Sequence, residues 1–133
     1  MKTILVVDDE YVTHRIIQVI LGKLHYNIIS AYNGLEAVQR LAENSVDMII
    51  TDVNMPYMDG ISLLDAIRTG ERCRNLPVVV ITSSPLPEVP KEAVEKGATA
   101  FIYQPFSSFE LMSIVSDCLQ QDYILSGIDE ERK

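Results

Sequence analysis

Five short runs of apolar residues, rich in isoleucine and valine, constrain the fold of this chain more than any other feature. Each run is apolar almost without interruption, as expected of strands covered on both faces of a sheet. The runs are Thr3–Val7, Asn27–Ala31, Met48–Thr51, Val78–Thr82 and Ala100–Tyr103. Segments with helical spacing separate them, and strict alternation of strand and helix produces crossover connections and a parallel sheet. The 133 residues therefore predict one α/β domain of five strand–helix units.

Apolar residues spaced three and four apart mark four of the helices. The expected inward positions are Val12, Ile16, Val19 and Ile20 in the first, Leu35, Val38, Leu41 and Ala42 in the second, Ile61, Leu64 and Ile67 in the third, and Leu111, Ile114, Val115, Cys118 and Leu119 in the last. The last helix also begins with a capping box, in which Ser107 and Glu110 bind each other's backbone amides.

The segment between the fourth and fifth predicted strands contains Pro85, Pro87 and Pro90. Because proline is tolerated only in the first turn of a helix, we expect a helix that begins near Pro90 and ends at Gly97. With about two turns, it is predicted to be the shortest helix of the fold.

The charge balance argues against several classes of protein. Nineteen acidic and 11 basic residues leave a net charge of −8, which disfavours binding to nucleic acid or to an anionic membrane surface. No apolar run approaches the ~20 residues that span a bilayer, and the first residues do not resemble a signal peptide. Cys73 and Cys118 stand far apart and outside any metal-binding spacing, which is typical of reduced thiols. These features predict a cytoplasmic protein.

Acidic residues follow two of the predicted strands. Asp8 and Asp9 come directly after the first strand, and Asp52 follows the third. If the strand order is 2-1-3-4-5, these strands are neighbours about 4.8 Å apart, and the three carboxylates share one crevice. At ~5 Å and an effective dielectric constant of about 20, each pair repels by roughly 3 kcal/mol. Either some of the carboxyl groups are protonated or a cation neutralises them, and Mg²⁺ suits such hard oxygen ligands. Taken singly, Asp9 is also a candidate helix cap and Asp52 a candidate turn residue.

Together with three other motifs, the acidic pair resembles the receiver domain of two-component response regulators. The motifs are the stretch from Asp52 to Gly60 with the pattern D-x-x-M-P-x-M-D-G, the pair Thr82-Ser83, and Gln104-Pro105-Phe106. The resemblance covers residues 3 to about 121 and implies a flavodoxin-like α/β fold with strand order 2-1-3-4-5. We therefore expect a receiver domain over residues 1–121 and a tail or linker over residues 122–133.

The resemblance implies a role for each acidic residue. Asp52 would take a phosphoryl group from the phosphohistidine of a histidine kinase and form an acyl phosphate. Asp9, Asp52 and the backbone carbonyl of Asn54 would hold Mg²⁺ directly, with Asp8 acting through water. The cation offsets the repulsion between the carboxylate and the phosphoryl oxygens. Structural roles are implied for Pro56, Gly60 and Pro105.

The main departure from the family is Gln104, because family members normally carry a lysine at that position. A glutamine amide can donate a hydrogen bond, but it is neutral. We therefore expect phosphorylated Asp52 to be less stabilised, and its coupling to the switch residues Thr82 and Phe101 to be weakened. For Phe101 the alternative is a plain core phenylalanine. The resemblance also implies a cis peptide before Pro105.

A sensor histidine kinase or a phosphotransfer protein is the expected phosphodonor. A downstream effector is expected to bind the face formed by the last two helices and the fifth strand, with Tyr103, Phe109 and Met112. Core or half-buried packing is the preferred interpretation of these aromatic side chains. A homodimer is a further candidate partner. No contact with nucleic acid or membrane is expected. The chain is expected to be a switch rather than an enzyme.

Three competing functions remain. The first is a phosphorylation-independent protein-interaction module, a pseudo-receiver, which Gln104 supports. The second is an aspartyl-phosphate phosphatase, which needs a second aspartate where Asn54 stands. The third is a flavodoxin-type electron carrier, whose phosphate loop Asp8-Asp9-Glu10 would repel. We interpret His14 and His25 as an ordinary helix and turn residue, far from the strand ends.

Overall fold

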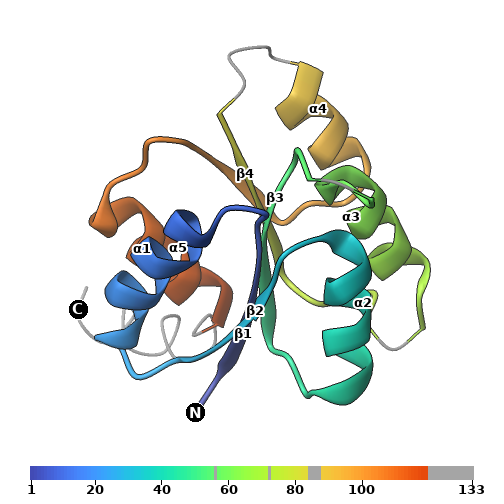
Figure 1. The fold of residues 1–133 in the computed structure, drawn as a ribbon. Coiled ribbons are helices and arrows are strands. Elements are labelled where there is room, and N and C mark those ends of the chain that lie inside the picture. Colours follow the sequence, from blue (N-terminus) through green and yellow to red (C-terminus); the bar gives the residue numbers. More distant parts are fainter. Residues whose placement is uncertain (56, 72, 84–87, 120–133) are drawn as a thin grey trace, which may run out of the picture.

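Five parallel strands form one sheet in the computed structural model, which describes residues 1–55, 57–71, 73–83 and 88–119. The strands are β1 (Thr3–Val7), β2 (Asn27–Ala31), β3 (Met48–Asp52), β4 (Val78–Thr82) and β5 (Ala100–Tyr103). Their order is β2-β1-β3-β4-β5, and each neighbouring pair is parallel (Figure 1). The predicted flavodoxin-like α/β fold and its strand order are therefore confirmed.

Five helices cover the two faces of the sheet. They are α1 (Tyr11–Gly22), α2 (Gly34–Glu43), α3 (Gly60–Thr69), α4 (Glu88–Glu95) and α5 (Ser108–Leu119). Figure 1 shows α1 and α5 on one face and α2, α3 and α4 on the other. Because successive strand residues point to opposite faces, Ile4 and Val6 join the core under α1 and α5, whereas Leu5 and Val7 join the core under the other helices.

The helix in the proline-rich region differs slightly from its prediction. The sequence predicts a start near Pro90 and an end at Gly97, but α4 runs from Glu88 to Glu95. Pro90 is thus its third residue, still within the first turn, where a proline costs no helical hydrogen bond. Among the described helices α4 is the shortest, as predicted. Pro85, Pro87 and the tail over residues 122–133 lie outside the described residues.

The predicted inward faces of α1 and α2 are wrong at most positions, although Ile20 and Leu41 are buried as expected. In α1 the side chains of Val12, Ile16 and Val19 are 63%, 47% and 51% exposed. The buried face consists instead of Thr13, His14, Ile17, Ile20 and Leu21. In α2 the expected residues Leu35, Val38 and Ala42 are likewise exposed, and the buried ones are Gly34, Ala37 and Leu41. On each of these helices, two rows of residues have the spacing of a buried helix face. Hydrophobicity alone predicted the wrong row.

The last helix follows its prediction closely. Ser107 and Glu110 form the capping box, with the two reciprocal hydrogen bonds at 3.0 and 3.2 Å. Leu111 and Val115 are buried, and the other expected residues of α5 pack against the same core. Cys73 and Cys118 are free cysteines. No helix within the described ranges is long and apolar enough to cross a membrane.

Candidate metal centre

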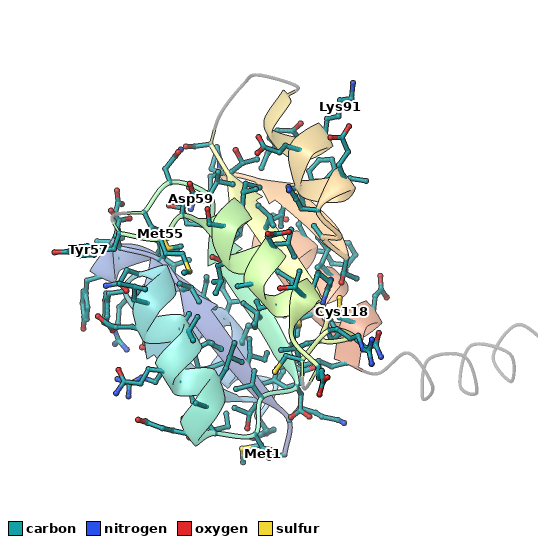
Figure 2. All side chains as sticks on the ribbon, turned by 90° about the vertical axis from the view of Figure 1, so that its right-hand side faces the viewer. Met1, Met55, Tyr57, Asp59, Lys91 and Cys118 are labelled. Atoms are coloured by element: carbon teal, nitrogen blue, oxygen red, sulfur yellow. The ribbon has the colours of Figure 1, made fainter. Side chains whose placement is uncertain are left out.

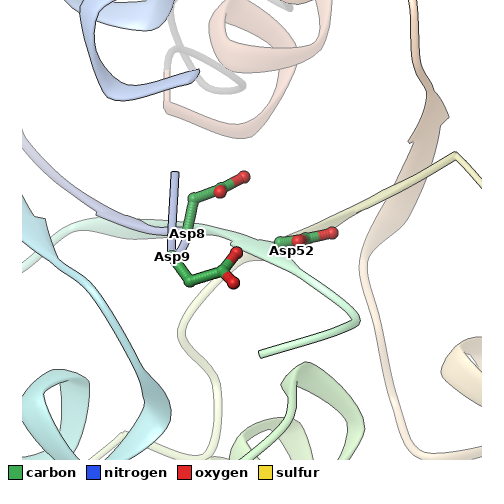
Figure 3. A group of neighbouring side chains, drawn as sticks. All are labelled: Asp8, Asp9 and Asp52. Carbon is green, nitrogen blue, oxygen red and sulfur yellow. The ribbon is translucent and has the colours of Figure 1, made fainter. Parts of the chain in front are cut away.

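Three carboxylates converge where β1 and β3 end. Asp52 is the last residue of β3, and Asp8 and Asp9 follow β1. Because Val7 pairs with Thr51 in the parallel ladder, the residues after them lie side by side at the same edge of the sheet. One carboxylate oxygen from each of the three residues lies within 4.8 Å of the others (Figure 3). The predicted convergence of Asp8, Asp9 and Asp52 is therefore present in the structure.

Backbone groups hold Asp8 and Asp52 in place. The Asp8 amide donates to the carbonyl of Ala31 at 3.1 Å, and Asp8 Oδ1 accepts from the amide of Glu10 at 2.8 Å. Asp52 Oδ1 accepts from the amide of Val53 at 2.8 Å. The helix-cap alternative for Asp9 is wrong, because the residue that precedes α1 is Glu10, and Glu10 makes no side-chain cap.

The electrostatics of the three acids show uncompensated negative charge. Burial raises the pKa of Asp52 to about 6, with further contributions from the charges of Asp8 and Asp9, against hydrogen bonds from the Val53 and Asn54 amides. Burial also raises the pKa of Asp8, which is 3% exposed. The ion pairs among the described residues, Arg40–Glu43 and Lys96–Asp65, lie elsewhere. Within the described part of the chain, no lysine or arginine pairs with these acids.

The donor set fits a magnesium ion. All three groups offer hard carboxylate oxygens, and Asp9 is open to solvent, which leaves room for bound waters. Ligands of an octahedral Mg²⁺ lie about 2.1 Å from the ion and so about 3 to 4 Å from one another. Oxygens within 4.8 Å of each other need only small side-chain rotations to reach that geometry. Bound Mg²⁺ would also remove the repulsion that raises the pKa of Asp52.

The loop after β3 is fitted closely against the end of the strand. A Cβ on Gly60 would overlap the carbonyl oxygen of Asp52, and the Gly60 amide donates to the carbonyl of Val53 at 2.9 Å. The Gly34 amide donates to the carbonyl of Met58 at 3.2 Å, which ties the loop to α2. The loop residues Met55, Tyr57 and Asp59 lie at the end of the molecule remote from Met1 (Figure 2). Asn54 is exposed, and Pro56 lies outside the described residues.

Of the other expected site residues, Thr82 ends β4 and Gln104 follows β5, whereas Phe101 lies within β5, opposite Val80 in the middle of β4. Thr82 is buried, and its carbonyl accepts from the amide of Gln104 at 2.9 Å. The peptide between Gln104 and Pro105 is cis, as the resemblance implied. Phe101 is 36% exposed and packs edge-to-face on Tyr103, with ring centroids 5.6 Å apart. The core alternative for Phe101 is therefore wrong. The packed interpretation is also wrong for Phe109, which is 75% exposed.

One residue near the acids was missed by sequence reasoning. The interpretation of His14 as an ordinary helix residue far from the strand ends is wrong. Its ring is 1% exposed, and Nε2 lies 2.7 Å from the carbonyl oxygen of Asp8. The available signal was its spacing from Ile17 and Leu21, which places a polar residue on a buried stripe of α1.

Comparisons with known proteins agree with this geometry. A family model described as the response regulator receiver domain matches residues 4–116. Chemotaxis protein CheY-3 of Vibrio cholerae is 38% identical over 109 residues, which are 81% of this chain and 84% of that protein. Two-component response regulator-like protein PRR37 of Oryza sativa is 31% identical over 130 residues, 96% of this chain. The chain spans only 18% of the length of that rice relative.

Solved structures share the same fold. The receiver domain of sensor histidine kinase PA1611 from Pseudomonas aeruginosa PAO1 aligns with a TM-score of 0.82 and 27% sequence identity. The alignment covers 89% of this chain and 97% of that chain. That receiver domain was crystallised with a magnesium ion coordinated in its active site cleft.

Proposed function

Because this chain belongs to the response regulator receiver domains of two-component signal transduction, we propose that Asp52 accepts a phosphoryl group from a phosphohistidine on a partner protein. The observation that carries the proposal is the convergence of three carboxylates within 4.8 Å, with no protein cation paired to them in the described residues. Asp9, Asp52 and the carbonyl of Asn54 would hold Mg²⁺, and Asp8 would act through water. When bound, Mg²⁺ supplies positive charge that offsets the repulsion between carboxylate and phosphoryl oxygens.

In this transfer the protein mainly positions the reacting groups and neutralises charge. A carboxylate oxygen of Asp52 forms a bond to phosphorus as the phosphorus–nitrogen bond of the phosphohistidine breaks, and the bonding pair returns to the imidazole nitrogen. Asp52 must be ionised to attack, and a pKa of about 6 leaves it mostly ionised at neutral pH. The hydrogen bond from the Val53 amide to Asp52 Oδ1 helps to orient the carboxylate.

The response to phosphorylation would run through β4 and β5. Thr82 lies at the end of the strand next to β3, and Gln104 is bonded to it through the backbone. Gln104 would donate an amide hydrogen bond to the phosphoryl group but supply no charge, so phosphorylation would shift the conformational equilibrium only weakly. Phe101 and Tyr103, both partly exposed on β5, would transmit the shift to an effector bound over α4, β5 and α5, or to a second copy of the chain.

The phosphodonor would dock on α1 beside the acids. Tyr11, Val12, Ile16 and Val19 expose an apolar face there, and a cavity of about 380 Å³ between Ile16 and the Gln104–Pro105 turn continues it. A histidine-phosphorylated protein with an apolar helix suits this face. Ile16→Gln is expected to slow phosphotransfer from such a protein about tenfold and to leave acetyl phosphate labelling unchanged. Val38→Gln, at an exposed apolar position on α2, is the control. Equal rates of phosphotransfer to wild type, Ile16→Gln and Val38→Gln would refute this docking site.

Mass spectrometry after incubation with Mg²⁺ and either acetyl phosphate or a phosphorylated histidine phosphotransfer protein tests the main proposal. We expect one phosphoryl group on a peptide that contains Asp52, and none in Asp52→Asn. Asp59→Asn is the matched control, because Asp59 is an exposed acid of the same loop whose capping bond to the Ser62 amide an asparagine can keep. Absence of label with both donors would contradict the proposal.

One observation favours a second function, a pseudo-receiver that acts through protein contacts alone. The neutral Gln104 leaves the site without the positive charge that a lysine would supply. In that case Asp52 stays unlabelled, and an effector binds wild type and Asp52→Asn with the same affinity. Labelling of Asp52 accompanied by a change in effector affinity distinguishes the phosphorylated switch from this alternative.

A further inference from the structure

His14 lies beneath the acidic turn and is closed off from solvent. It is 1% exposed, and the ring of Tyr32 packs on it with centroids 4.4 Å apart. Its Nε2 lies 2.7 Å from the backbone carbonyl oxygen of Asp8. A carbonyl oxygen can only accept, so Nε2 must carry the proton and donate it. This hydrogen bond joins the first turns of α1 directly to the residue that opens the acidic site.

The unpaired Nδ1 of His14 indicates that the imidazole has a role besides packing. His14 Nδ1 is buried and has no hydrogen-bond partner among the described residues. An apolar side chain would fill the same place without burying an unpaired nitrogen, as Ile17 and Leu21 do on the same stripe. The imidazole therefore contributes something specific through Nε2, namely its bond to Asp8.

Asp8 is fixed at three points, and among the described residues only His14 holds it through a side chain. The Asp8 amide is held by the carbonyl of Ala31, and its carboxylate is held by the amide of Glu10. Both partners are backbone groups, which remain whatever side chains those positions carry. The His14 bond holds the Asp8 carbonyl, and it thereby sets how the peptide between Asp8 and Asp9 is oriented.

We propose that His14 is a positioning residue for the divalent-cation site. Its Nε2–H holds the Asp8–Asp9 peptide so that both carboxylates face Asp52, and Tyr32 shields this hydrogen bond from water. The inference rests on the proposed function, because it presupposes that the three acids bind Mg²⁺. Partners that orient a ligand without touching the metal typically change metal affinity by about 10- to 100-fold when they are removed.

A Mg²⁺ titration followed by amide NMR shifts tests the inference. His14→Leu keeps the approximate volume and removes the donor, and we expect its dissociation constant for Mg²⁺ to rise about tenfold. His14→Gln places an amide N–H at a similar reach from the backbone and should bind within about twofold of wild type. His25→Gln, an exposed histidine at the far end of α1, is the control and should match wild type. Thermal unfolding in EDTA reports the stability of each variant separately.

The outcomes separate this inference from the proposed function. If wild type fails to bind Mg²⁺, the proposed metal site itself is wrong. If wild type binds and His14→Leu binds equally well, His14 has no positioning role. Should His14→Leu fail to fold, long-range ¹⁵N spectra of wild type decide instead. His14 should carry a proton on Nε2, and its ring signals should shift as Mg²⁺ saturates the site; an Nε2 without a proton, or a ring indifferent to Mg²⁺, overturns the inference.

Discussion

The carboxyl edge of the sheet has two halves that are built differently. The acidic side consists of Asp8, Asp9 and Asp52. Backbone amides and His14 hold Asp8 and Asp52 by hydrogen bonds, and the adjacent loop packs so closely that Gly60 has no room for a side chain. The response side, consisting of Thr82, Tyr103 and Gln104 at the strand ends and Phe101 in the adjoining part of β5, is more open. There a cavity of about 380 Å³ adjoins Gln104, and both aromatic rings are partly exposed.

The difference is consistent with the proposed function, in which one side binds the cation and the other responds to phosphorylation. A group of like charges must be held by fixed backbone groups, because each carboxylate would otherwise turn away from the others. A segment that responds to a new phosphoryl group must instead have space to move and few contacts to break. Variants on the two sides should therefore change different properties, and by different amounts.

The largest effect is expected where the acidic side has no space. In Gly60→Ala the new Cβ overlaps the Asp52 carbonyl oxygen, so the strand end or the loop must shift. We expect the free energy of unfolding in urea to fall by about 3 kcal/mol or more. Gly22→Ala is the matched control, because nothing lies within 4 Å of its Cβ, and its stability should stay equal or rise slightly. Equal stability of the two variants would show that the loop is not closely fitted.

A positive charge added on the response side should change the pKa of Asp52 on the acidic side. A lysine in Gln104→Lys can extend its ammonium group toward the acids, and an opposite charge favours the ionised form of a carboxyl group. The pKa of Asp52, about 6 in the wild type, should therefore fall by about one unit, and phosphorylation should shift effector binding more strongly. Carboxyl ¹³C NMR titration measures the pKa, with Gln104→Met as the neutral control. An unchanged pKa would mean that the two sides are electrostatically independent.

Without Mg²⁺, the acidic side should destabilise the protein as the pH rises. Asp52 has a pKa of about 6 in the folded protein against 3.8 for an aspartate in the unfolded chain, so the folded protein binds its proton more tightly. Its contribution to stability is complete below about pH 4 and is lost as the pH rises through about 6. Since Asp52 is partly exposed, we expect Asp52→Asn to be more stable than wild type by only about 1 kcal/mol at pH 7, and equally stable at pH 4. Urea unfolding in EDTA at the two pH values checks this, and a difference independent of pH would exclude the charge as its cause.

The smallest effect is expected at the aromatic pair of the response side. Phe101→Leu removes the edge-to-face contact with Tyr103, which should lower the free energy of unfolding by about 0.7 kcal/mol. Phe109→Leu, at a position that is 75% exposed, should be indistinguishable from wild type. If Phe101→Leu lowered the free energy of unfolding as much as Gly60→Ala, the two sides would not differ in how closely they are packed.

Much of the fold could be predicted because its signals are local. A buried parallel strand is a continuous apolar run, so four of the five strands have the bounds read from the sequence, and β3 is longer by one residue, Asp52. The positions of the acids followed from the same runs, since the residue after a strand lies at the edge of the sheet. The strand order could not be predicted from local signals, because alternation of strand and helix does not say which strands are neighbours. It was predicted from the family resemblance.

The faces of α1 and α2 could not be predicted, for a physical reason. In α1 the stripe through Val12 and Ile16 is more apolar than the stripe through Thr13 and His14, yet the second one is buried. The rotation of a helix about its axis is fixed by contacts at its ends as well as by its apolar residues. Here His14 binds the carbonyl of Asp8, and in α2 the Gly34 amide binds the Met58 carbonyl.

The sequence by itself determined which segments are strands, which are helices and which residues stand at the strand ends, because periodicity and turn residues act over a few neighbouring positions. Only the tertiary structure decided which faces of α1 and α2 are buried, that His14 lies under Asp8, and that Phe101 lies at the surface. Those outcomes depend on contacts between residues far apart in the chain, and a local pattern carries no information about such partners.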